Sequence, residues 1–161
     1  MNIQAVVFDL DDTLISEKQY VTSGFRVVSR FVSDRFGIDE SAVFDTLHQL
    51  FAADSKRVFN RMFEELRIPY QEDDIRRLIE LYRNHNPQIE FFDDVIPCLT
   101  YLRNHGVKTG VITDGYKVTQ WKKLKAVSAE IWCDHIIVTD ELGKDFWKPH
   151  PYPFELMAEK L

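Results

Sequence analysis

The chain has 161 residues, of which 45% are hydrophobic, and its formal net charge at pH 7 is −6. A chain of this length can bury one sizeable core, or a core with a small attached subdomain. The acidic balance argues against nucleic acid or an anionic membrane as the main partner. The N-terminal apolar run is too short for a signal peptide or a membrane span, and Cys98 and Cys133 lack metal-ligand spacing. We therefore expect a cytoplasmic protein with reduced thiols.

The first predicted element is a strand over residues 3–8, followed at once by the acidic run DLDDT at residues 9–13. A short β-branched and aromatic run is typical of a buried parallel strand, and catalytic groups gather at the carboxyl ends of such strands. Residues two apart in an extended segment point the same way, so Asp9 and Asp11 can share one site. Two carboxylates in one pocket repel unless a cation such as Mg²⁺ neutralises them. One could then attack a phosphoryl group while the other moves a proton. The alternative is an acidic turn without catalytic function, because aspartate favours turns.

Apolar residues at helical spacing follow this turn and predict four amphipathic helices joined by short loops. Their ranges are 19–36, 41–53, 55–67 and 72–84. Such a run is typical of a small helical bundle, and its aromatic residues are expected in the core.

Strands and helices alternate in the remainder of the chain. Helices are predicted over 93–104, over 116–126 and from residue 151 onward, and strands over 107–113 and 134–139. This alternation predicts an α/β fold with a doubly wound parallel sheet. The helix over 116–126 carries basic residues that we interpret as a solvated face: Lys117, Lys122, Lys123 and Lys125.

Three short motifs, in this order, resemble those of the haloacid dehalogenase (HAD) superfamily. FDLDDTL resembles its first motif, DxDxT; the predicted strand ending at Thr113 resembles the second; and Lys148-Pro149, at the opening of a helix, resembles the third. The resemblance covers nearly the whole chain. It implies a discontinuous HAD-like core of residues 1–15 and 91–161, with residues 16–90 as a helical cap of the C1 type.

The resemblance also implies a role for each motif residue. Asp9 would be the nucleophile and a Mg²⁺ ligand. Asp11 would be the general acid and base and would give its backbone carbonyl to the metal, while Thr13 would brace Asp11. The phosphoryl oxygens would be bound by a further group of residues, namely Thr113, Asp114, Gly115 and Lys148.

The acid at position 11 narrows the set of HAD reactions expected of this chain. HAD dehalogenases and P-type ATPases lack it, whereas phosphatases and phosphomutases need an acid to protonate an alkoxide. The predicted function is Mg²⁺-dependent hydrolysis of a small phosphate monoester, a sugar phosphate or nucleotide, through an aspartyl-phosphate. A phosphomutase and a non-catalytic scaffold that binds a phosphometabolite or a partner chain remain open; the long helical insert argues against a receiver domain.

The run ITDGYKVTQWKKLKAV further resembles the ITNGxxxxQxxKL run of HAD phosphatases that act on acylneuraminate 9-phosphates and nucleoside monophosphates. Residues on that pattern include Thr113, Gly115, Gln120 and Leu124, and Asp114 replaces its Asn.

Two features depart from the family pattern. Lys148 stands two residues later than in the common GxxKP form, and the acidic fourth motif, which supplies a further Mg²⁺ ligand and a strand beside the first, is not found before Leu161. Val6 and Phe8 would then line an open sheet edge, which favours association. We expect a fragment of a longer polypeptide, or a homo-oligomer or partner chain that completes the sheet. Asp93 and Asp94 are weaker alternatives as ligands, because they precede a helix.

Overall fold

The computed structural model describes residues 3–161 and contains one parallel sheet in that part of the chain. Its strands are β1 (Ala5–Phe8), β2 (Lys108–Thr113) and β3 (His135–Val138), in the order β1-β2-β3. Phe8 lies beside Val111 and Thr113 beside Val138, so the carboxyl ends of the strands meet at one edge of the sheet. The predicted parallel α/β sheet is confirmed.

Strand β1 is more exposed than its apolar run predicted, and in the described residues it forms the open edge expected for Val6 and Phe8. It pairs only with β2 within residues 3–161, and Val7 is 41% exposed. The apolar run predicted a buried strand, but an edge strand in the described part of the chain has a neighbour on one side only. Its side chains are therefore exposed or half-buried, as expected for an open edge.

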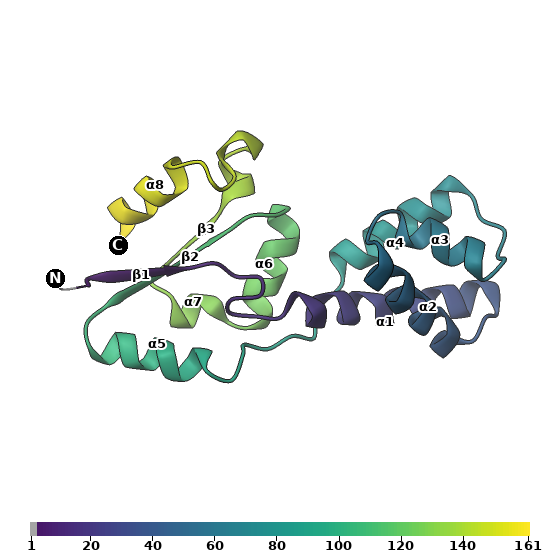
Figure 1. The fold of residues 1–161 in the computed structure, drawn as a ribbon, viewed down its shortest axis with the longest axis horizontal. Helices are drawn as coiled ribbons and strands as arrows, with labels where there is room; N and C mark the ends of the chain where they lie inside the picture. Colours follow the sequence, from purple (N-terminus) through teal and green to yellow (C-terminus); the bar gives the residue numbers. More distant parts are fainter. Residues whose placement is uncertain (1–2) are drawn as a thin grey trace. The chain divides into compact units, whose positions relative to one another are not determined.

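Helices cover both faces of the sheet, as the doubly wound prediction requires (Figure 1). Helices α5 (Val95–Asn104), α6 (Lys117–Ala126) and α7 (Ala129–Trp132) lie on one face, where their apolar residues form a cluster with Val111 and Val138. Helix α8 (Tyr152–Lys160) lies on the other, where Met157 packs with Ile112 and Ile137. A Cβ added at Gly110 would lie 2.6 Å from the sulfur of Met157, so the Met157 side chain would have to shift to accommodate one.

The chain divides into two compact units. Met1–Tyr20 and Asn86–Leu161 form the unit that contains the sheet, and Val21–His85 forms a helical unit. The short 3₁₀ helices η1 (Thr139–Glu141) and η2 (Lys144–Phe146) follow β3 in the sheet unit. Neither they nor α7 were predicted, because segments this short carry no helical period.

The helical unit contains most of α1 (Glu17–Phe36), together with α2 (Glu40–Ala53), α3 (Val58–Glu65) and α4 (Glu72–Asn84). Its core consists of the apolar residues at helical spacing, among them the fully buried Phe25, Val32 and Phe63. Asp39 caps α2 by accepting the N–H of Ala42 at 2.9 Å. No helix in residues 3–161 combines the length and the apolar character that crossing a membrane requires.

Candidate active site

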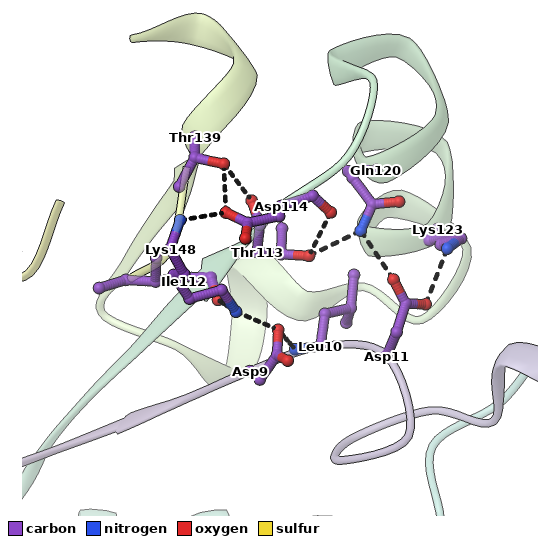
Figure 2. A network of polar contacts seen from close by, with 10 residues as sticks. All are labelled: Asp9, Leu10, Asp11, Ile112, Thr113, Asp114, Gln120, Lys123, Thr139 and Lys148. Atoms are coloured by element: carbon purple, nitrogen blue, oxygen red, sulfur yellow. Dashed lines mark hydrogen bonds and ion pairs between the residues drawn. The ribbon is translucent and has the colours of Figure 1, made fainter. Parts of the chain in front are cut away.

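The acidic run after β1 folds into a tight turn. The carbonyl of the fully buried Leu10 accepts the N–H groups of Thr13, Leu14 and Ile15 at 3.3, 2.9 and 3.2 Å. Asp12 has a φ of 53°, in the left-handed region that aspartate tolerates better than most residues. The buried Leu10 side chain anchors the turn in the core. Asp9 and Asp11 then lie at the carboxyl edge of the sheet (Figure 2).

Asp9 forms an ion pair with Lys148. Oδ1 of Asp9 lies 2.8 Å from Nζ of Lys148 and accepts the N–H of Leu10 at 2.8 Å. Lys148 also donates to the carbonyl of Ile112 at 3.1 Å. The Asp9 side chain is 47% exposed, and its Oδ2 makes no hydrogen bond or ion pair with any described residue. Asp9 thus presents one free carboxylate oxygen beside a fixed cation.

The side chain of Asp114 holds the segment that carries Lys148. Its Oδ1 accepts the backbone N–H of Lys148 at 3.2 Å and the hydroxyl of Thr139 at 2.6 Å. Thr139 Oγ1 also lies 3.3 Å from the carbonyl of Thr113. Asp114 was expected in the phosphate-binding group, whereas Thr139 was not predicted as a site residue. The available signal for Thr139 was a polar residue at the carboxyl end of the third predicted strand.

The Asp11 carboxylate is held on both oxygens by helix α6. Lys123 Nζ lies 2.7 Å from Oδ1, and Gln120 Nε2 donates to Oδ2 at 2.9 Å (Figure 2). Gln120 Nε2 lies 2.6 Å from the hydroxyl of the buried Thr113, so one side chain joins the first motif to the second. The expectation that Lys123 belongs to a solvated face was wrong, because it is 4% exposed and turned toward the sheet.

The sequence of residues 6–161 matches the model of a protein family described as haloacid dehalogenase-like hydrolases. The chain belongs to this family. The match confirms the resemblance that the three motifs indicated, and it covers both the sheet unit and the helical unit.

Curated relatives in the HAD family match nearly the whole chain. A glyceraldehyde 3-phosphate phosphatase of Pyrococcus abyssi is 26% identical over 160 residues, and the match covers 95% of this chain and 66% of that protein. Pyrophosphatase PpaX of Bacillus mycoides is 26% identical over 165 residues, with 100% of this chain and 70% of that protein covered. The chain therefore spans about two thirds of the length of the curated relatives it matches.

A solved structure shares the fold. It comes from Thermotoga maritima and is provisionally named a β-phosphoglucomutase; it aligns with a TM-score of 0.68 at 20% identity and covers 98% of this chain and 70% of that one. At this identity the likeness concerns the fold, and it supports the α/β HAD-like architecture.

Thr13 and Gly115 are the remaining residues expected at a HAD site, and their surroundings in the structure are as follows. Thr13 is exposed, and within residues 3–161 no hydrogen bond joins its side chain to Asp11, which Gln120 and Lys123 hold instead. Gly115 has a φ of 127°, and a Cβ there would lie 3.0 Å from the Gln120 side chain. Lys123 falls on the lysine of the QxxKL run, which is the signal that could have identified it.

Oxygen donors for a metal ion are few at this edge of the sheet. No group of three or more His, Cys, Asp or Glu residues that could hold a metal occurs in the described part of the chain. The Asp9 carboxylate and the backbone carbonyl of Asp11 are hard donors. Mg²⁺ commonly binds through one or two carboxylates, with water and substrate phosphate as its other ligands. This donor set fits Mg²⁺ better than a metal that needs a full protein cage.

Proposed function

We propose that this protein is a Mg²⁺-dependent phosphatase that hydrolyses a small phosphate monoester through an aspartyl-phosphate on Asp9. The observation that carries the proposal is the Asp9–Lys148 pair at the carboxyl edge of the sheet, with Nζ and Oδ1 2.8 Å apart. A nucleophile for phosphorus needs a free oxygen, and Oδ2 of Asp9 has no partner among the described residues. Membership of a hydrolase family supports the same chemistry.

In the proposed reaction, Oδ2 of Asp9 attacks phosphorus and the bond from phosphorus to the ester oxygen breaks. Asp11 acts first in its protonated form and gives that proton to the departing alkoxide. The carboxylate so formed, paired with Lys123, then takes a proton from the water that attacks the aspartyl-phosphate. The second attack releases inorganic phosphate and restores Asp9. Lys148 offsets the negative charge of the phosphoryl oxygens.

The other expected site residues are proposed to bind the phosphoryl group. The hydroxyl of Thr113 and the backbone N–H groups of Asp114 and Gly115 would donate to its oxygens. Asp9 and the Asp11 carbonyl would hold Mg²⁺, which supplies charge neutralisation at the phosphoryl group when bound. Thr13 is proposed to support the conformation of the first motif.

The helical segment of residues 16–90 is proposed to be a C1 cap that selects the substrate. The relatives give two substrate classes to test, because one is named for glyceraldehyde 3-phosphate and the other for pyrophosphate. The substrate panel should therefore contain a triose phosphate, hexose phosphates, nucleoside monophosphates and inorganic pyrophosphate.

The test is phosphate release from this panel with and without Mg²⁺, using Asp9→Asn as the control for the nucleophile. The expected result is release that requires both Mg²⁺ and Asp9, with ¹⁸O from labelled water in the released phosphate. Turnover that survives in Asp9→Asn would contradict the proposed nucleophile. Binding of phosphate esters without any release by the unaltered protein would favour the non-catalytic scaffold.

A further inference from the structure

The proposed reaction assigns no role to Lys123, a charged residue of helix α6. It is 4% exposed, and its ammonium lies 2.7 Å from Oδ1 of Asp11. Its Nζ also lies 4.5 Å from the centre of the Tyr20 ring. Burial of an ammonium group is costly unless a partner compensates it. The carboxylate and the aromatic face supply that compensation, so Asp11 and Lys123 constrain each other.

Gln120 binds the second oxygen of the Asp11 carboxylate. It donates to Oδ2 at 2.9 Å, while Lys123 takes Oδ1, so the two carboxylate oxygens have separate partners. Both partners come from one face of α6, because residues three apart on a helix are neighbours. The Leu124 side chain beside them is fully buried in the sheet unit, which fixes α6 against the site. The direction of the Asp11 carboxylate is thus set by a rigid element.

We infer that Lys123 and Gln120 are positioning residues that aim Asp11 at the leaving oxygen of the substrate. The inference rests on the proposed function, since it concerns the acid of that reaction. Neither residue is assigned a contact with the substrate in the proposed reaction. A general acid acts only within hydrogen-bond reach of the atom it protonates, so free rotation of Asp11 would lower the rate of proton transfer.

A positioning role for Lys123 should affect esters differently according to the basicity of their leaving groups. An alkyl phosphate releases a strongly basic alkoxide and depends on proton donation, whereas p-nitrophenyl phosphate releases a stable phenolate and depends on it little. The ratio kcat/KM includes the steps up to formation of the aspartyl-phosphate and excludes its later hydrolysis. A variant that only loosens the fold would lower kcat/KM for both esters by the same factor.

The experiment compares Lys123→Met with the unaltered protein and with Lys125→Met, an exposed lysine on the same helix. In Lys123→Met, kcat/KM for the alkyl ester should fall about 10- to 100-fold, and that for p-nitrophenyl phosphate no more than about threefold, given the usual contribution of general acids. Lys123→Arg should recover part of the loss, and Lys125→Met should change neither ester. Gln120→Leu, which leaves the Lys123 pair intact, provides a second variant if Lys123→Met does not fold.

Equal loss for the two esters, or no loss in either, would overturn the positioning role while leaving the phosphatase proposal intact. Failure of the unaltered protein to release phosphate from every ester is a different result. It would overturn the proposed function, and the inference would fall with it.

Discussion

Asp9 and Lys148 come from opposite ends of the chain, and their side chains form an ion pair with Oδ1 and Nζ 2.8 Å apart. The backbone of Lys148 is tied to Asp114, which is tied to Thr139 in turn. The pair is therefore held by the carboxyl ends of all the strands in the described part of the sheet. Its geometry depends on these ties as much as on the two charged residues.

Replacing Lys148 with methionine should abolish most of the phosphatase activity. The ammonium is the cation beside the free oxygen of Asp9, and removal of one preorganised electrostatic donor typically lowers kcat by about 100- to 1000-fold. Steady-state kinetics with the preferred ester should show this loss. Lys160→Met, at an exposed position on α8, is the matched control and should retain full activity. A Lys148→Met enzyme with unchanged kcat would remove this residue from the mechanism.

The Asp11–Lys123 pair should show strong coupling in stability. Asp11→Asn leaves a buried ammonium without its carboxylate, so the free energy of unfolding should fall by about 2 kcal/mol. Adding Lys123→Met should recover most of that loss, because the unpaired charge is then gone. Urea unfolding of the two single variants and the double variant completes the cycle. Additive effects of the two substitutions would show that the pair does not persist in solution.

Thr139→Val tests the tie between β3 and the Lys148 segment. The change keeps the shape of a fully buried side chain but removes the hydroxyl that Asp114 accepts at 2.6 Å. The unfolding free energy should decrease by about 1 kcal/mol. Activity should decrease by about tenfold, because a small shift of Lys148 spoils its alignment. Thermal unfolding and kinetics provide the two readouts, with the exposed Thr100→Val as control. A loss of stability without any change in kcat would show that Thr139 stabilises the fold but does not position Lys148 for catalysis.

Asp134 should make stability depend on acid pH. The backbone N–H of Thr109, 2.8 Å from its Oδ2, lowers the pKa of Asp134 from 3.8, with Lys108 acting in the same direction against partial burial. A folded-state pKa below the unfolded one stabilises the fold above the unfolded value, and this contribution is lost as pH falls through the folded value. The difference in unfolding free energy between the unaltered protein and Asp134→Asn should therefore be largest near neutrality and shrink as the pH falls below the ordinary aspartate pKa of 3.8. A difference that does not vary with pH would contradict the shift. The carboxylate is 40% exposed, so salt should weaken the effect.

Much of the fold follows from local patterns. Short apolar runs located the strands, and helical spacings located the longer helices, because these patterns reflect which parts of a single element are apolar. The segments that were missed, α7, η1 and η2, are too short to show a period. The apolar run predicted a buried β1, because such a run does not reveal how many strands lie beside it. The open edge expected for Val6 and Phe8 is the arrangement found in residues 3–161.

At the site, the sequence by itself determined the chemical groups and their order: acids directly after the first strand, Thr113 at the end of the second, and a lysine before Pro149. Only the tertiary structure decided which groups meet. It brought Lys148 to Asp9, turned the Asp114 carboxylate toward a backbone N–H, and buried Lys123 against Asp11. The reason is that the position of a charged residue in the sequence does not show what surrounds its side chain. Whether the side chain is solvated, or buried and paired, depends on how its helix packs on the sheet.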